Sequence, residues 1–263
     1  MNLDLISSKL EQLQTQPGQN NQQKFDRSQF FWKAPQGKSQ IRFVPFKENK
    51  ENPFSELYFH YGIGNRTMIS PINYGEKDPI VEFSKELRKT SEPENWRLAK
   101  KLEPKMRVFA PVIVRGEENK GVRFWEFGKQ VYQELLSVAA DEDYGDFTDV
   151  AQGLDMTVEV VQGNPYPQTS LRVKPKQSPL SDDNASVEKW LADQPELLKY
   201  YKKWSYDEMK TALQNWLNPE DENGSIMDGP ATDFGKDEKP GYTLNVKEKS
   251  KDFNESEFED IFK

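Results

Sequence analysis

NWRLAKKLEPKMRVFAPVIVRGEENKGVRFWEFGKQVY, residues 95–132, is the stretch that decides the fold and points to a partner. Residues 95–129 hold nine Lys or Arg against four Glu, although the whole chain carries a net charge of -8. Aromatic side chains are interspersed among these cations, and alternation of apolar and polar residues indicates strands. Since cations bind phosphates and ring faces stack on exposed bases, the segment favours a single-stranded nucleic acid as partner.

On both sides of this stretch, short segments continue the alternation of apolar and polar residues. Six strands are predicted, over residues 39–46, 56–63, 106–116, 121–127, 154–162 and 169–176. Within 106–116 the apolar series from Val108 to Val114 predicts a buried face. Arg107, Phe109 and Arg115 fall on the other face and predict an exposed binding surface. Pro111 has no N–H, which predicts an edge or a bulge.

Helices are fewer than strands in the central part of the chain. One helix is predicted over residues 129–140, and three helical segments over 185–217, where Ser205 and Glu208 have the spacing of a capping box. Few helices are available to connect parallel strands, so a parallel α/β sheet is not expected. We predict a mainly β chain with added helices (α+β), built on a small antiparallel barrel.

The two ends differ from the core. Residues 1–24 carry an apolar stripe at helical spacing, which predicts a short arm that docks on another subunit; a frayed terminus is the alternative. The stripe consists of Leu3, Ile6, Leu10 and Leu13. Residues 221–263 hold twelve acids against six bases, which predicts a flexible acidic tail. We divide the chain into arm (1–24), core (25–180), helical extension (181–220) and tail (221–263).

Composition excludes several classes of site. The chain has no cysteine, so it has neither disulfides nor a thiol nucleophile nor a thiolate metal site. No apolar run approaches the roughly 20 residues of a transmembrane helix, and the N-terminus lacks the pattern of a signal peptide. We therefore expect a soluble intracellular protein. His60, the one histidine, is expected to be structural.

Candidate contacts follow from strand alternation and from the opening segment. The candidates for phosphate binding are Arg42, Lys100, Lys101, Lys105, Arg107, Arg115, Arg123, Lys129, Arg172, Lys174 and Lys176. The candidates for base stacking are Trp96, Phe109, Trp125 and Tyr132. Trp32, Tyr58 and Tyr166 are second-rank candidates. The alternative interpretation is that the rings form the core and the cations only surround it.

An acidic stretch offers a rival from another class. Between Asp141 and Glu159 lie seven acids and no base, and carboxylate pairs of this kind hold Mg²⁺ in nucleases. The order of residues does not match a calcium-binding loop, because the twelfth position is Gln152 rather than Glu. A solvated acidic loop after a helix is the favoured interpretation. The carboxylate-metal nuclease and an RNA-binding protein remain the alternatives.

The chain resembles the helix-destabilising single-stranded-DNA-binding proteins of T-even-type phages. The resemblance rests on FFWKAPQGKSQIRFVP, PFSELYFHYGI, RVFAPVIVRG and FWEFGKQVY, and on the plan of arm, core and acidic tail. It implies an OB-fold core that binds single strands, cooperative binding through the arm, and a tail that recruits replication, recombination and repair proteins. The predicted anchors in the tail are Phe253, Phe258, Ile261 and Phe262. It also implies a non-enzymatic protein acting in the cytoplasm of an infected bacterial host.

Two features depart from the family pattern. The resemblance implies a zinc site of one His and three Cys, and His60 lies where the histidine is expected, but every cysteine is missing. We therefore predict no zinc and no other cofactor. The arm has a single cation, Lys9, in place of a basic cluster, so self-association is expected to depend on its apolar stripe.

Overall fold

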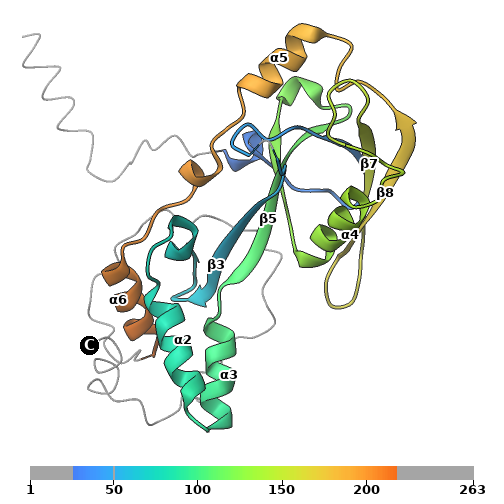
Figure 1. Cartoon of the computed structure of the whole chain (residues 1–263). Helices are drawn as coiled ribbons and strands as arrows, with labels where there is room; N and C mark the ends of the chain where they lie inside the picture. The colour runs from blue at the N-terminus through green and yellow to red at the C-terminus, as the bar shows by residue number, and fades with distance from the viewer. Residues whose placement is uncertain (1–25, 50, 218–263) are drawn as a thin grey trace, which may run out of the picture.

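The computed structural model describes residues 26–49 and 51–217, which form two lobes (Figure 1). The sheet lobe contains β1 (Phe31–Trp32), β2 (Gly37–Phe43), β6 (Arg123–Phe127), α4 (Lys129–Ala139), β7 (Leu154–Val161), β8 (Gln168–Gln177) and α5 (Asn184–Ala192). The helical lobe contains β4 (Arg66–Ile69), α2 (Pro79–Lys89), α3 (Pro93–Leu102) and α6 (Tyr206–Leu217). β3 (Ser55–Ile63) and β5 (Lys105–Val114) extend from one lobe into the other.

The strands form one mixed sheet of eight strands. Its main path is β1-β6-β5-β2-β7-β8, and β3 pairs with β5 and β4 off this path. The β1–β6 pair is parallel and the other pairs are antiparallel. The α+β class is thus confirmed, and each of the six predicted strands is present with ends shifted by a few residues.

β5 changes partner along its length. Its first half, from Lys105 to Phe109, pairs with β3, and its end, from Val112 to Val114, pairs with β2. Pro111 lies between these two pairings, so its missing N–H costs no hydrogen bond to either β3 or β2. Pro111 is therefore in an inner strand that pairs with β6 on its other side, not at the predicted edge or bulge.

A tight turn joins β3 to β4. Ile63 pairs with Arg66, so the connection is the dipeptide Gly64-Asn65. Both residues have positive φ, 60° and 54°, as a type I′ hairpin turn requires. Gly and Asn tolerate this conformation, so the local sequence directs β4 back onto β3.

The helices α2 and α3 were not predicted from the sequence, and each begins with a proline, Pro79 or Pro93. Both prolines occupy the first turn of their helix, where the absent N–H costs nothing. Asp78 caps α2 by accepting hydrogen bonds from the N–H groups of Ile80 and Val81. The apolar faces of α2, α3 and α6 bury a common core that includes Phe83, Leu102 and Leu213.

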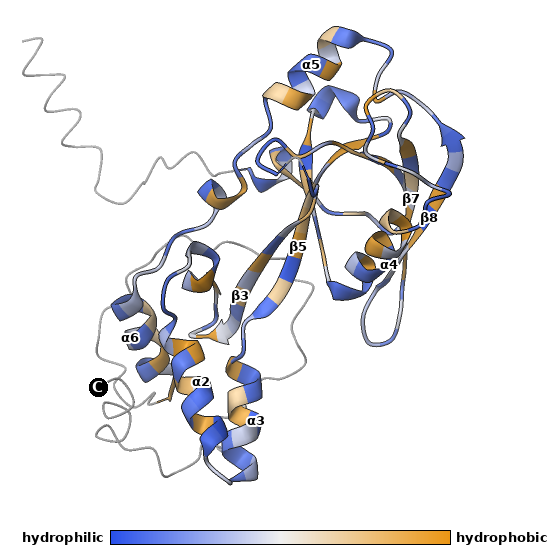
Figure 2. Cartoon of the chain, viewed as in Figure 1, coloured by the Kyte–Doolittle hydropathy of each residue, from blue (hydrophilic) through white to orange (hydrophobic). Residues whose placement is uncertain are grey.

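Both faces of the sheet are covered in its middle. One core, including Phe43, Val112 and Trp125, lies on the face that packs against α4. Phe59, Phe109 and Tyr201 belong to a core on the other face, and Ile113 and Trp190 belong to its neighbour. Figure 2 shows β5 changing from hydrophilic near α3 to hydrophobic within the sheet lobe.

The strap, residues 193–205, joins α5 to α6 and includes the short helix η4 (Leu197–Tyr200). It runs alongside β3 and β5 from one lobe to the other (Figure 1). The predicted capping box ends it: Ser205 N–H donates to Glu208 Oε2 at 2.8 Å, and Glu208 N–H donates to Ser205 Oγ at 3.2 Å. In the part of the chain that the structure describes, no helix is long and apolar enough to cross a membrane.

Candidate nucleic-acid interface

The pairing register places several predicted contact residues on one side of the sheet. Arg42 is opposite Ile113 on β5 and Asp155 on β7, and Thr157 of β7 is opposite Arg172 on β8. Directly paired residues point to the same side of a sheet, as do residues two apart on a strand. Arg107, Phe109, Arg115, Arg42 and Arg172 therefore share one side, as strand alternation predicted for each strand separately.

The prediction that this side is exposed is wrong in its middle. Phe109 is fully buried, because Phe31, Phe59 and Tyr201 pack around it. Arg42 is also fully buried. Sequence alternation shows which side a residue faces but not what covers it, and Phe31 and Tyr201, which cover Phe109, are far from it in the sequence. Neither side chain is open to a base or a phosphate.

Three further candidates lie on the opposite side. Trp125 is opposite Ala110 and Arg123 is opposite Val112, so both point toward the core beneath α4. Trp125 and Tyr132 are buried there, and the Tyr132 hydroxyl donates to Glu56 at 2.9 Å. Arg123 is buried and paired with Glu117 at 2.6 Å. For these residues, the alternative that rings form the core is the correct interpretation.

Arg42 and Arg115 instead hold Asp155. Arg42 Nε donates to Asp155 Oδ1 at 2.9 Å, and Arg115 Nη2 donates to the same oxygen at 2.9 Å. Burial alone would raise the pKa of Asp155, but hydrogen bonds and charge from Arg115, Gln40 and Arg42 hold this pKa below its ordinary value. The cluster ties β2, β5 and β7 together, so these arginines are structural.

The remaining candidates near β5 form an exposed series, which we call the α3–β5 track. Trp96 is 50% exposed, with the Lys100 ammonium 5.8 Å from its ring centroid. Lys105 Nζ reaches the Lys100 carbonyl at 3.5 Å, and Arg107 follows two residues later on β5. Arg107 lies against Gly128 and pairs with Glu126. The track is completed at the start of α4 by Lys129, which is exposed.

Four other predicted cations are accessible but lie away from this series or at its edge. Lys101 is exposed on α3. On β8, Arg172 and Lys176 are exposed and Lys174 is half-buried, where it donates to Gln40 at 2.5 Å. β8 is the last strand of the sheet path, two strands beyond β2, so its cations form a separate patch from Lys105 and Arg107.

Sequence reasoning missed the strap. Residues 199–206 read KYYKKWSY, the same mixture of lysines and rings that marked residues 95–132. The sequence predicts a helical extension over residues 181–220, and in the structure these residues also place cations beside rings. Lys202 Nζ lies 4.0 Å from the Trp204 ring centroid, and Lys203 Nζ lies 4.9 Å from that of Tyr74.

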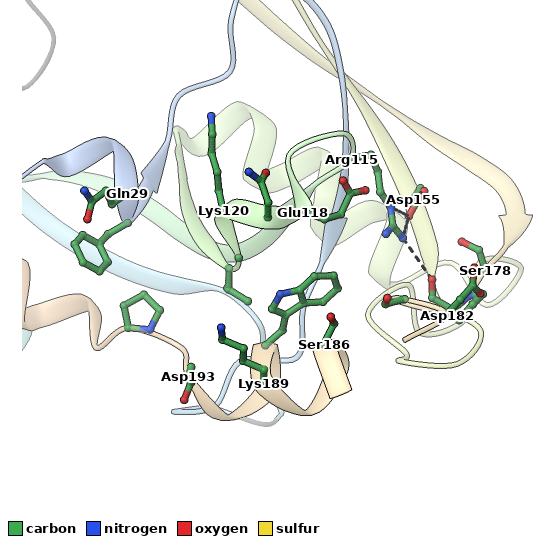
Figure 3. Close-up of a pocket in the computed structure, with 18 of the residues that line it drawn as sticks. Gln29, Arg115, Glu118, Lys120, Asp155, Ser178, Asp182, Ser186, Lys189 and Asp193 are labelled. Atoms are coloured by element: carbon green, nitrogen blue, oxygen red, sulfur yellow. Dashed lines mark hydrogen bonds and ion pairs between the residues drawn. The ribbon is translucent and has the colours of Figure 1, made fainter. Parts of the chain in front are cut away.

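An open pocket of about 950 Å³ lies beside α5 (Figure 3). Arg115, Lys120 and Lys189 line it, but so do acids. The acids are Glu118, Asp155, Asp182 and Asp193. This balanced charge does not favour a polyanion, so the pocket is a poor candidate for the nucleic-acid path.

His60 lies in a buried polar cluster in the helical lobe. Its Nε2 is 2.9 Å from Asp78 Oδ2, and its Nδ1 is 2.9 Å from the Leu102 carbonyl. Ser70 Oγ also donates to Asp78. With both ring nitrogens engaged and no cysteine in the chain, these residues do not fit the implied zinc site.

The acids of the stretch 141–159 serve mainly local structure. Asp146 accepts hydrogen bonds from Thr148, and Asp149 accepts them from Ala151 and Gln152. Asp155 belongs to the arginine cluster. Among residues 26–49 and 51–217, no three His, Asp or Glu side chains are grouped so that they could hold a metal ion. The arm stripe and the tail anchors lie outside the described residues.

Comparison with known proteins identifies the family of the chain. A search of curated protein sequences finds no match. A family model described as gp32 DNA binding protein like matches residues 35–218, which span β2 to the end of α6. Because this match covers more than half of the chain, the protein belongs to the gp32-like DNA-binding protein family.

Proposed function

We propose that the protein coats single-stranded DNA through the α3–β5 track, with cations against phosphates and Trp96 against a base. The observation that carries the proposal is an exposed tryptophan continuous with a row of cations, in a chain that belongs to a DNA-binding family. An exposed indole costs solubility, so a ring held beside lysines is best explained by a ligand with both charged and planar parts.

The chemistry of each contact follows from its surroundings. Lys100 and Lys105 are exposed point charges, suited to phosphates on a mobile strand. Arg107 pairs with Glu126, and its side chain is 31% exposed, so a phosphate would compete with that carboxylate. Duplex DNA hides its base faces by stacking, so a Trp96 contact favours single strands.

We further propose that the sheet lobe is an OB-fold. Supporting this, β2 pairs with both β5 and β7, β5 pairs with β6, and β7 pairs with β8. In chain order these strands are β2, β5, β6, β7 and β8, and the helix α4 lies between β6 and β7. It covers one end of their core. A partly open five-stranded barrel of this kind is a common scaffold for binding single strands.

Other parts of the proposal rest on the family resemblance. We propose that the protein is not an enzyme, needs neither zinc nor another cofactor, and serves DNA replication, recombination and repair in the host cytoplasm. Self-association would use the stripe of residues 1–24, and the acidic tail would recruit partner proteins. The engagement of both His60 nitrogens by Asp78 and Leu102 supports a metal-free helical lobe.

Quenching of tryptophan fluorescence tests the proposal. Poly-dT should quench the tryptophan fluorescence of the full-length protein more strongly than duplex DNA does. The slope of log K against log salt should be about -0.7 for each phosphate neutralised. Comparison with poly-U distinguishes DNA from RNA binding. Magnesium-dependent cleavage of single strands, lost on Asp141→Asn or Asp143→Asn, would contradict the proposal in favour of a nuclease. A salt slope near zero would contradict the electrostatic part.

A further inference from the structure

The strap concentrates cations and rings on the surface between the lobes. Residues 199–203 hold three lysines and no acid, in a chain whose net charge is -8. Trp204, next to them, is half-buried and packs against two cores, one in the helical lobe and one on the β3–β5 sheet. Its position is thereby fixed, while the residue as a whole stays partly accessible. A fixed and partly exposed aromatic residue beside exposed cations is a suitable stacking platform.

The cations around this ring come from separate elements. Lys202 lies 4.0 Å from the Trp204 ring centroid, and Arg66 of β4 approaches the same ring from 5.9 Å. Lys203 lies 4.9 Å from Tyr74, in the short helix η2 (Pro71–Tyr74). Elements far apart in the sequence therefore supply cations and rings to one surface.

The lysines already have partners, and these partners are readily replaced. Lys202 pairs with Glu208 at 3.1 Å, and Lys203 pairs with Glu76. All four side chains are between 45% and 51% exposed. Exposed ion pairs contribute little to stability, so a phosphate can displace either glutamate at little cost.

Contacts connect this surface to the α3–β5 track. Arg107 and Arg27 both pair with Glu126. Arg27 Nη2 donates to the hydroxyl of Tyr201 at 3.1 Å, and Lys202 is the next residue of the strap. Arg27 thus links Arg107 of the track, through Glu126, to Tyr201, the strap residue that directly precedes Lys202.

We propose that the strap surface formed by Arg66, Tyr74, Lys202, Lys203 and Trp204 is a second contact region for the same single strand. The inference rests on the proposed function and adds to it a path that crosses from the track to the strap. Lys202 and Lys203 neutralise phosphates, and Trp204 offers its accessible ring to a base.

The double variant Lys202→Gln/Lys203→Gln tests this. Two lost phosphate contacts should make the slope of log K against log salt less steep by about 1.4. The control is Lys120→Gln/Lys189→Gln at the balanced pocket beside α5, which removes the same charge from exposed positions. The control should keep the wild-type slope, and both variants should keep the wild-type melting midpoint, because exposed pairs contribute little to stability.

The outcomes separate the two proposals. If wild-type protein shows no salt-dependent binding of poly-dT, the proposed function itself fails. If wild-type protein binds but the strap variant keeps its slope and affinity, only the strap inference fails. An equal change in strap variant and control also overturns it, because net charge alone then explains the effect. Unchanged DNA binding with lost binding of an acidic peptide overturns it in favour of a protein partner.

Discussion

Trp96 and Trp125 show how differently one residue type is used in this chain. Both lie in the segment that suggested a binding face, yet Trp96 is 50% exposed on α3 and Trp125 is 3% exposed beneath α4. Trp96→Ala should weaken poly-dT binding by about 1–3 kcal/mol, the range for one stacked base, and leave the melting midpoint unchanged. Titration by fluorescence anisotropy measures the first quantity and calorimetry the second.

Trp125→Ala should lower the stability of the fold rather than weaken DNA binding directly. The indole packs against Trp32, Phe43 and Phe127, so its removal leaves a cavity that costs about 3–5 kcal/mol of folding free energy. Chemical denaturation measures this loss. If Trp125→Ala weakened DNA binding while stability stayed at the wild-type value, the ring would belong to the interface after all.

Asp78 should make stability depend on acid pH. Burial alone would raise the pKa of Asp78, but hydrogen bonds from His60, Ser70 and Val81 outweigh it and hold this pKa below its ordinary value. A depressed pKa contributes stability that is present above the unfolded-state value of about 4 and is lost as pH falls through the folded-state value. Asp78→Asn should therefore lower stability by about 1–3 kcal/mol at neutral pH, because it weakens the buried hydrogen bonds that the carboxylate accepts.

The pH profile of unfolding free energy checks this prediction. The difference in unfolding free energy between Asp78→Asn and wild type should become smaller as pH falls from about 5 toward 2. Asp182→Asn, which changes an exposed acid, serves as the control and should follow the wild-type curve. A constant difference in unfolding free energy at every pH would contradict a role for the charge on Asp78, because Asn can still cap α2.

At the scale of elements, the turn before β7 is closely packed around Gly153. A Cβ atom here would lie 2.7 Å from Arg42 Nη1 and 2.7 Å from the Phe147 carbonyl, and against the Asp149 carbonyl as well. Gly153→Ala should destabilise the fold by about 1–3 kcal/mol, as overpacking does. Gly128→Ala is the matched control for stability, since its Cβ would meet only Arg107 Nη1, at 3.6 Å. Equal melting midpoints for both variants would contradict the packing argument.

Elements differ in how far the sequence predicts them. Alternation was sufficient for all six strands, and the Ser205–Glu208 capping box was confirmed, because both signals are local. The helices α2 and α3 were missed; their apolar faces are buried against each other and against α6, which lies more than 100 residues further along the chain. Burial was predicted for Val108 and Val112 but not for Phe109, whose cover comes from Tyr201 and Phe31. Of the candidate site, the exposed residues from Trp96 to Lys105 were predictable, whereas the strap depends on tertiary neighbours.

For the whole molecule, the prediction that the helical lobe folds without zinc can be tested directly. The His60–Asp78–Ser70 cluster links β3, α2 and the start of η2, where the resemblance implied a metal. We expect the melting midpoint of the purified protein to be unchanged by EDTA and by added zinc, and metal analysis to find no stoichiometric zinc. A lower midpoint in EDTA, restored by zinc, would contradict this.

The shared strand β5 has a consequence for the order of folding. The pairing of β2 with Val112–Val114 joins residues far apart in the sequence, and β3, β4, α2 and α3 all lie between them. Contacts close in sequence form faster than distant ones, so we expect these elements to gain protection first in pulsed hydrogen exchange. The ordered first half of β5 would then present its second half in register to β2. Simultaneous protection of β2 and β3 would contradict this sequence of events.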